Sequence, residues 1–223
     1  MEQFYGRFIK AGDLCFDVGA NVGNRTDVFL RLGARVIAVE PQPFCVATLT
    51  RRFGGDGRVT LVPKALGRSP GQGQLQVSQA HTLSSMSADW IRTVKASGRF
   101  RDYEWRQKIT VPVTTLDELI ADYGTPAFCK IDVEGFELPV LQGLSRPLRA
   151  VSFELTPEYI DSAIACLTHL ASLGPTEFNY SIAETMEMEL PQWVDAGTMV
   201  QALASLPDRS IFGDIYARGT AVR

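Results

Sequence analysis

The sequence predicts an α/β fold with a doubly wound, mainly parallel sheet, and two observations support this prediction. Short apolar runs with the composition of buried strands alternate with amphipathic segments long enough to form helices. Polar residues or glycines follow these runs, as expected where a ligand lies at the carboxyl ends of parallel strands. The 223 residues, of which 45% are hydrophobic and 21% charged, fit a single domain over residues 1–223.

The first part of the chain is expected to supply three buried strands and two helices. Asn24 is suited to capping the first helix, and Pro41 stops the second strand. The predicted strands are 14–20, 35–41 and 59–66, and the predicted helices are 25–33 and 43–53.

A β-hairpin or lid insertion around 67–112 is predicted to interrupt this alternation. Residues 74–78 and 109–116 alternate between apolar and polar, as strands do when one face is open. Between them, residues 79–108 show no clear period and carry six Lys or Arg and three Asp or Glu among several aromatic residues. Two alternatives stay open for this segment: a lid over the substrate, or an amphipathic helix packed on the sheet edge.

Regular alternation resumes after residue 114. Thr115 to Glu118 form a capping box that opens a helix ending near Gly124. Thr156 is expected to cap the longest helix. The predicted apolar stripe of that helix consists of Ile160, Ile164, Leu167 and Ala171. The further predicted segments are a strand and loop at 128–135, strands at 150–155, 178–184 and 212–219, and helices at 136–144, 156–174 and near 197–206.

The glycine-containing stretch DVGANVG, residues 17–23, follows the first strand and predicts a ligand-binding loop. Gly19 and Gly23 permit a tight turn close to a ligand, and the following helix points free N–H groups into the same space. Asp17 can accept a hydrogen bond from a ligand ammonium. Asn21 replaces the middle glycine that a dinucleotide pyrophosphate requires. The loop therefore favours S-adenosylmethionine, which has a ribose and an amino acid end but no pyrophosphate.

Glu40 ends the second strand, where an acidic side chain accepts hydrogen bonds from ribose hydroxyls. A carboxylate at this position disfavours NADP, because it would repel the 2′-phosphate. Two rival functions stay open at this point. One is an NAD-dependent oxidoreductase on a Rossmann fold, and the other is a non-catalytic nucleoside-binding module.

The stretch KIDVEGFE, residues 130–137, places acidic side chains at another strand end. Lys130 and Asp132 face the same way along the strand and are expected to pair or to meet a ligand. Either Asp132 or Glu134 can accept a proton from a hydroxyl group, and His81 is a third candidate base. The same carboxylates can contribute to a divalent metal site, but two of them do not define one, and no metal ligand is predicted.

These stretches together resemble the FkbM family of S-adenosylmethionine-dependent methyltransferases. The resemblance rests on FDVGANVGNRTDVFLRLGARVIAVEPQP, VPKALG, VPVTTLDEL, KIDVEGFELPVLQG and SFEL, in that order, and runs from about Cys15 to Leu155. It implies a Rossmann-like class I methyltransferase fold and O-methylation of a hydroxyl on a small molecule, such as a sugar or a polyketide-type natural product.

The cofactor-binding residues predicted from the strand ends and from this resemblance come from several parts of the chain. They are Asp17, Gly19, Asn21, Gly23, Asn24, Glu40, Pro41, Ala65, Leu66 and Asp132. The resemblance implies that Ala65 and Leu66 line the adenine. Lys64 stands where many class I methyltransferases carry an acid that holds the adenine amino group, so backbone groups are expected to recognise the adenine here.

Composition narrows the range of partners and compartments. The net charge of −3 and the absence of a long basic stripe argue against a nucleic-acid partner. No apolar run is long enough to span a bilayer, and the first residues lack the apolar core of a signal peptide. Four dispersed cysteines are expected to be reduced, which predicts a cytoplasmic protein. The expected acceptor is a small molecule, and the sequence does not specify an oligomeric state.

Overall fold

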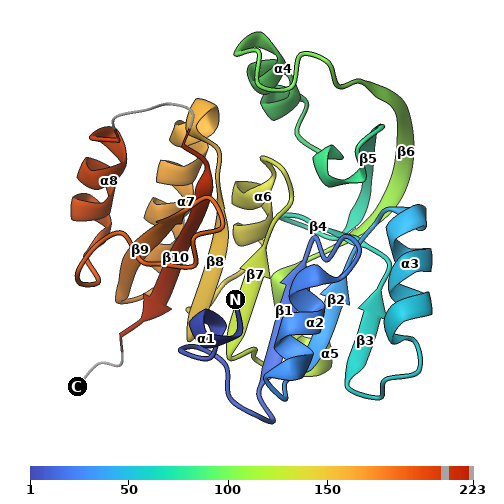
Figure 1. The fold of residues 1–223 in the computed structure, drawn as a ribbon, viewed down its shortest axis with the longest axis horizontal. Coiled ribbons are helices and arrows are strands. Elements are labelled where there is room, and N and C mark those ends of the chain that lie inside the picture. Colours follow the sequence, from blue (N-terminus) through green and yellow to red (C-terminus); the bar gives the residue numbers. More distant parts are fainter. Residues whose placement is uncertain (207–210, 221–223) are drawn as a thin grey trace.

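The computed structural model describes residues 1–206 and 211–220 and contains a seven-stranded sheet in the order β3-β2-β1-β7-β8-β10-β9 (Figure 1). The first five of these strands are parallel, and β10 runs antiparallel to both β8 and β9. This arrangement confirms the predicted doubly wound, mainly parallel sheet. The strands are β1 (Leu14–Val18), β2 (Arg35–Val39), β3 (Val59–Val62), β7 (Phe128–Ile131), β8 (Ala150–Leu155), β9 (Thr176–Ile182) and β10 (Gly213–Gly219).

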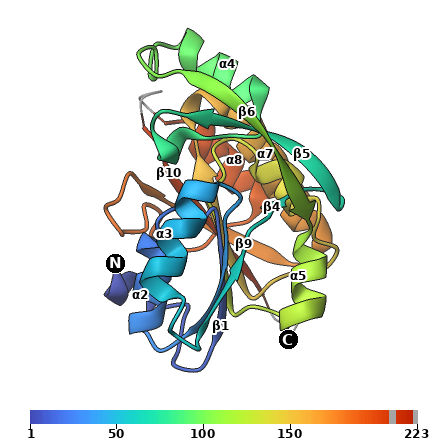
Figure 2. The same ribbon diagram turned by 90° about the vertical axis from the view of Figure 1, so that its right-hand side faces the viewer.

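Helices cover both faces of the sheet because both faces of its central strands are apolar (Figure 2). In β1, Cys15 belongs to the core under one set of helices, and its neighbour Phe16 belongs to the core under the other. One face carries α1 (Glu2–Tyr5), α2 (Asn24–Arg31) and α3 (Pro43–Phe53). The other carries α5 (Leu116–Tyr123), α6 (Glu137–Leu141), α7 (Ile160–Leu173) and α8 (Ala196–Ala204).

The predicted insertion forms a second sheet beside the carboxyl ends of the main strands. The predicted third strand breaks after Val62, and the chain continues as β4 (Ala65–Leu66) in the sheet β4-β6-β5. In this sheet β5 (Gly71–Ser78) pairs antiparallel with β6 (Trp105–Thr114), which confirms the hairpin. The second sheet and α4 (Ala88–Ala96) lie above the main sheet in Figure 1.

Two predicted helix caps are wrong. The N-cap of α2 is Gly23, with a left-handed backbone (φ 88°), and Asn24 is already the first helical residue. Thr156 precedes a short 3-10 turn over Pro157–Tyr159, so α7 begins only at Ile160 and its N-cap is Tyr159. The cap of α5 is confirmed, because Thr115 Oγ1 accepts a hydrogen bond of 3.1 Å from the Glu118 backbone N–H.

The predicted apolar stripe of α7 is also largely wrong. Leu167 is buried as expected, but Ala171 is exposed and Ile160 and Ile164 are only half-buried. Small and apolar residues occur almost all round this helix, so its sequence defines no single stripe, and contacts with the sheet select the buried one. The buried residues of α7 are Ala163, Cys166, Leu167 and Leu170.

None of the helices in the described ranges is long and apolar enough to cross a membrane. All four cysteines are buried and none forms a disulfide, as the sequence predicted. These buried thiols pack in the core. Burial raises the pKa of the Cys15 thiol to about 12.

Candidate functional site

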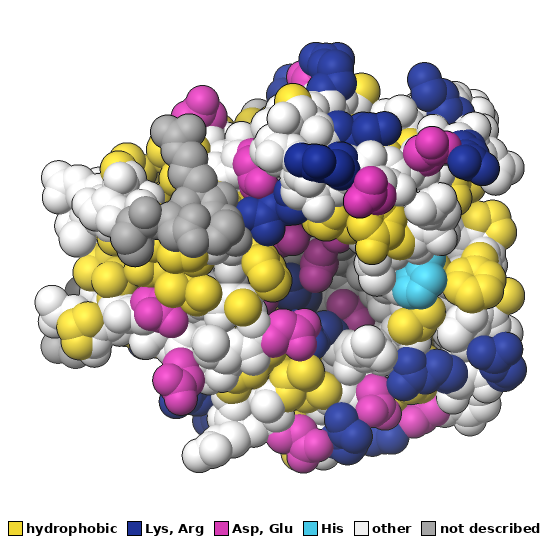
Figure 3. Space-filling view, turned by 45° about the horizontal axis from the view of Figure 1, so that its top comes forward, with side chains coloured by type: hydrophobic (Ala, Val, Ile, Leu, Met, Phe, Trp, Pro, Cys, Tyr) yellow, Lys and Arg dark blue, Asp and Glu magenta, His cyan; other side chains and the backbone are white. Residues whose placement is uncertain are grey.

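A cleft opens at the carboxyl ends of the parallel strands, where β1 lies between β2 and β7 and the strand order reverses. Figure 3 shows acidic side chains gathered in the hollow and Lys and Arg side chains on the surface above it. The cleft has two halves. The apolar half, which contains Ala65, Leu66, Leu75 and Met86, has an empty volume of about 510 Å³. The polar half, which contains Asp17, Asn24, Arg25 and Lys130, has about 730 Å³. Both halves are lined by Gly19, Asn21, His81, Thr82, Asp132 and Glu134.

The glycine loop and Glu40 are joined by hydrogen bonds. Glu40 is 3% exposed, and its two carboxylate oxygens accept hydrogen bonds from the backbone N–H groups of Asn21 (2.9 Å) and Gln42 (2.8 Å). Burial raises the pKa of Glu40 to about 7, although these hydrogen bonds oppose the change. Asn21 adopts a left-handed backbone (φ 50°), which turns its N–H toward Glu40. Glu40 lines the apolar half, where it remains available to ribose hydroxyls.

The two glycines of the loop have a packing role in addition to the ligand approach that the sequence predicted. A Cβ on Gly19 would lie 1.8 Å from the backbone oxygen of Asp132, so this glycine lets the loops after β1 and β7 touch. A Cβ on Gly23 would lie 2.4 Å from the ring of Phe53 in α3. Gly19 also lines both halves of the cleft, but Gly23 lines neither. The assignment of Gly23 to cofactor binding is therefore not supported by its position.

Asp17 and Asn24 lie in the polar half of the cleft. The Asp17 carboxylate is buried and accepts a hydrogen bond of 2.5 Å from the Thr26 hydroxyl of α2. Burial raises its pKa, and Thr26 and Lys130 partly offset that effect. Asp17 belongs to β1 itself and is the register partner of Lys130 on the neighbouring strand β7. Asn24 lines the same half as the first residue of α2.

The apolar half contains the other predicted cofactor residues. Pro41 follows Glu40, and Ala65 and Leu66 form the short strand β4 at the opposite wall. The insertion closes this half from above with Leu75, Ser84 and Met86. Lys64 also lines this half, at the position where many class I methyltransferases carry an acidic residue.

Lys130 links the cleft to the C-terminal hairpin. Its ammonium, on a side chain 1% exposed, lies 3.2 Å from Asp132 and 2.9 Å from Asp214 of β10. Burial lowers the pKa of Lys130, but the two carboxylates raise it well above its ordinary value, so the ammonium stays charged. The Lys130–Asp132 pair confirms the sequence prediction. The contribution of Asp214 was not predicted, because it depends on β10 inserting between β8 and β9.

Three carboxylates converge at the ends of β7 and β8. Oxygens of Asp132, Glu134 and Glu154 all lie within 4.8 Å of one another. Burial and the neighbouring charges of Glu154 and Asp132 raise the pKa of Glu134 well above its ordinary value. Such a cluster can accept a proton at neutral pH, and its oxygens are also of the type that hold a divalent cation. Glu154 is the fifth residue of β8, and its place near the end of this apolar strand was the available sequence signal for it.

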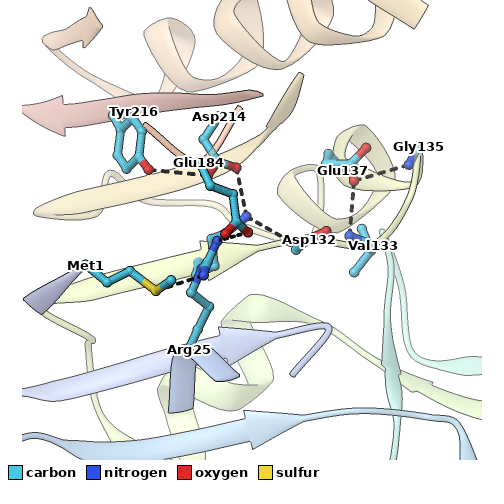
Figure 4. A network of polar contacts seen from close by, with 10 residues as sticks. Met1, Arg25, Asp132, Val133, Gly135, Glu137, Glu184, Asp214 and Tyr216 are labelled. Carbon is cyan, nitrogen blue, oxygen red and sulfur yellow. Dashed lines mark hydrogen bonds and ion pairs between the residues drawn. The ribbon is translucent and has the colours of Figure 1, made fainter. Parts of the chain in front are cut away.

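The loop that carries these acids is held from two sides. Glu137 accepts hydrogen bonds from the backbone N–H groups of Val133 (3.1 Å) and Gly135 (3.2 Å), as Figure 4 shows. Burial raises the pKa of Glu137 to about 7. Glu134 has a left-handed backbone (φ 54°), and its carbonyl oxygen accepts a 2.6 Å hydrogen bond from the Ser85 hydroxyl. These bonds fix the backbone of the acidic loop relative to α6 and to the insertion.

The segment 79–108 has features of both predicted alternatives, the lid and the packed amphipathic helix. Its helix α4 is amphipathic and buries Trp90, which packs directly on Gly135 of the acidic loop. The turn before it lies over the cleft, since the His81 carbonyl accepts hydrogen bonds from the side chains of Asn21 (3.3 Å) and Gln42 (2.9 Å). The His81 ring packs 5.7 Å from Phe44, and His81 lines both halves of the cleft.

Two residues of the polar half were missed in the sequence. Arg25 and Glu184 line it and form an ion pair of 2.9 Å. Arg25 directly follows the glycine loop, which was a usable signal. Glu184 follows β9, far along the chain, and only the tertiary fold brings it here.

The fold and this cleft define an α/β enzyme with a nucleoside-cofactor site at a topological switch point. A family model, the methyltransferase FkbM domain, matches residues 17–186, and the chain belongs to this family. Residues 17–186 thus form a methyltransferase domain of this family, as the sequence motifs indicated. Membership in this family favours a methyltransferase over the oxidoreductase.

Two curated relatives match parts of the chain. Hexuronic acid methyltransferase AglP of Haloferax volcanii is 29% identical over 143 residues, which are 63% of this chain and 54% of that protein. A chloroplastic ribosomal RNA small subunit methyltransferase of Arabidopsis thaliana is 36% identical over 50 residues, which are 22% of this chain and 15% of that protein. The chain thus spans about half the length of the first relative and less of the second.

Solved structures show the same fold. A precorrin-6y C5,15-methyltransferase from Geobacter metallireducens superposes with a TM-score of 0.52 at 10% identity, covering 97% of this chain and 85% of that one. An O-methyltransferase from Bacillus cereus, solved in complex with SAH, gives 0.50 at 10% identity, covering 98% and 78%. These similarities confirm the class I methyltransferase fold.

Proposed function

We propose that this protein transfers a methyl group from S-adenosylmethionine to a hydroxyl oxygen of a small molecule, such as a sugar or a polyketide-type natural product. The observation that carries the proposal is the group of carboxylates Asp132, Glu134 and Glu154 beside the glycine loop. An alcohol must lose its proton during methylation, and these groups are placed to accept it. A relative whose name specifies hexuronic acid supports a sugar-type acceptor.

The cofactor assignments follow from the two halves of the cleft. We assign the adenosine to the apolar half, where Glu40 would accept hydrogen bonds from the ribose hydroxyls and Ala65 and Leu66 would contact the adenine. We assign the amino acid end to the polar half, where Asp17 and Asn24 lie. The residues present fit this cofactor, because Glu40 is buried at a strand end and Asp17 offers a carboxylate to an ammonium.

S-adenosylmethionine supplies an activated methyl group when it is bound. The protein's contribution is to hold the acceptor oxygen in line and to remove its proton, and positioning accounts for most of the rate. Glu134 and Asp132 are the first two candidate bases: burial raises the pKa of Glu134, and Lys130 holds Asp132 in place. His81 lies at the same cleft and is the third candidate base.

The acidic character of the cleft also bears on the acceptor. Asp132, Glu134 and Glu154 would repel a phosphate backbone, so a nucleic-acid acceptor is not expected. The same oxygens are of the type that bind a divalent cation, and the proposal does not require one. Treatment with EDTA followed by added Mg²⁺ separates the two mechanisms, since only the metal route would lose activity and regain it.

The proposal is tested by methyl transfer from labelled S-adenosylmethionine to a panel of neutral sugars, hexuronic acids and polyketide alcohols, with mass spectrometry locating the methyl group. Asp132→Asn and Glu134→Gln should each lower kcat by about 10²-fold or more, whereas Asp122→Asn, on an exposed acid of α5, should not change it. Binding of S-adenosylhomocysteine should persist in Glu134→Gln and in Asp122→Asn. Transfer to carbon or nitrogen alone, or unchanged turnover in both cleft variants, would refute the proposal.

A further inference from the structure

The polar half of the cleft contains a guanidinium with unused hydrogen-bonding capacity. Two of the described residues that line this half are basic, Arg25 and Lys130. Lys130 is already held by two carboxylates, at 3.2 Å and 2.9 Å. Arg25 is the second residue of α2, and its side chain is only 16% exposed. It is therefore the cation in this half that can still take an anionic partner.

The contacts of Arg25 leave one edge of its guanidinium half-used (Figure 4). Nη2 donates to Oε1 of Glu184 at 2.9 Å, and Nη1 points to the sulfur of Met1 at 2.9 Å, a weak acceptor. Nε is buried and has no hydrogen-bond partner within the described ranges. Nε and Nη2 together form the edge that binds both oxygens of a carboxylate, but Glu184 uses only one of the two donors.

Glu184 is suited to leave this position. Its side chain is 64% exposed, and Arg25 is its one ion-pair partner among the described residues. An exposed carboxylate regains its hydration when it leaves, so little affinity is lost when another carboxylate replaces it. Arg25, in contrast, stays buried against the loop and would lose much more if left without an anion.

We propose that Arg25 is a carboxylate-binding residue of the cleft and that Glu184 occupies it as a stand-in until a ligand carboxylate arrives. The inference rests on the proposed function, because the carboxylate comes either from the amino acid end of the cofactor or from an acidic acceptor such as a hexuronic acid. In both cases the ligand receives two parallel hydrogen bonds, from Nε and Nη2, in place of the single bond to Glu184.

Calorimetric binding tests the cofactor as the source. Arg25→Met should weaken S-adenosylhomocysteine about 10- to 100-fold, since charged hydrogen bonds are lost, and should leave its decarboxylated analogue unaffected. Arg25→Lys should give an intermediate loss, because it keeps the charge without the fork. Arg31→Met is the matched control, on the same helix but outside the cleft, and should change neither affinity.

Methyl-transfer kinetics test the acceptor as the source. If the acceptor supplies the carboxylate, Arg25→Met should leave the affinity for S-adenosylhomocysteine unchanged and raise KM for a hexuronic acid at least tenfold, relative to the matching neutral sugar. Glu184→Gln removes the competing charge and should tighten whichever ligand binds Arg25 severalfold, an effect that a purely structural ion pair would not produce.

The outcomes separate this inference from the proposed function. Unchanged Kd and KM values in Arg25→Met, together with no tightening in Glu184→Gln, would refute the role of Arg25 while methyl transfer to oxygen continued. Conversely, S-adenosylhomocysteine binding that depends on Arg25, without methyl transfer to any hydroxyl, would refute the proposed function and leave the carboxylate site standing.

Discussion

Replacing Gly19 by alanine tests the close contact on which the cleft is built. Gly19 has φ 81°, and a Cβ there would lie 1.8 Å from the backbone oxygen of Asp132 and 2.8 Å from its carbonyl carbon. Neither atom can rotate away, because the Asp132 backbone N–H donates to the Val18 carbonyl at 2.9 Å and fixes the two loops together. The substitution must therefore separate the loops after β1 and β7.

The cost has two parts. The left-handed backbone of a non-glycine residue costs about 1–2 kcal/mol, and forcing extra volume into a packed contact adds about 1–3 kcal/mol. Gly19→Ala should thus lower the free energy of unfolding by about 2–5 kcal/mol in urea denaturation. Gly12→Ala is the matched control, because Gly12 has φ 86° but a Cβ there meets no atom within 4 Å. It should show the backbone cost alone.

The difference between these two variants is the measured quantity. Gly19→Ala should be less stable than Gly12→Ala by at least about 1 kcal/mol and should also weaken S-adenosylhomocysteine, since Asp132 moves with its carbonyl. Equal unfolding free energies for the two variants would refute the packing argument, and would mean that the loops separate at no cost.

Three further predictions concern charges and caps. In the proposed site, cofactor hydroxyls would donate to ionised Glu40, whose pKa is raised to about 7. The affinity for S-adenosylhomocysteine should then rise about tenfold from pH 6 to pH 8 and stay flat in Glu40→Gln, as calorimetry would show. Lys130→Met should destabilise the fold by about 3–5 kcal/mol in urea, because it leaves the buried Asp214 carboxylate unpaired, and adding Asp214→Asn should restore part of the loss. Thr115→Ala should cost about 1 kcal/mol in the same assay, through the lost cap of α5.

Most of the main sheet could be predicted because its strands are short apolar runs separated by clear turn residues. The two misplaced caps, of α2 and α7, show where that reasoning ends. Gly23 takes the cap position from Asn24 because its positive φ and its contact with Phe53 exclude a side chain. The buried stripe of α7 could not be predicted, because apolar residues surround that helix and only the sheet selects a face.

The sequence by itself determined the fold class, the family and the acids at the strand ends, because local patterning and motif order encode them. It also predicted the Lys130–Asp132 pair, since residues two apart on a strand share a face. The tertiary structure alone decided which distant groups join them: Asp214, Glu154, and Glu184 against Arg25. Asp214 depends on the antiparallel insertion of β10, Glu154 on the pairing of β8 with β7, and Glu184 on the turn after β9. No local pattern specifies which strands become neighbours.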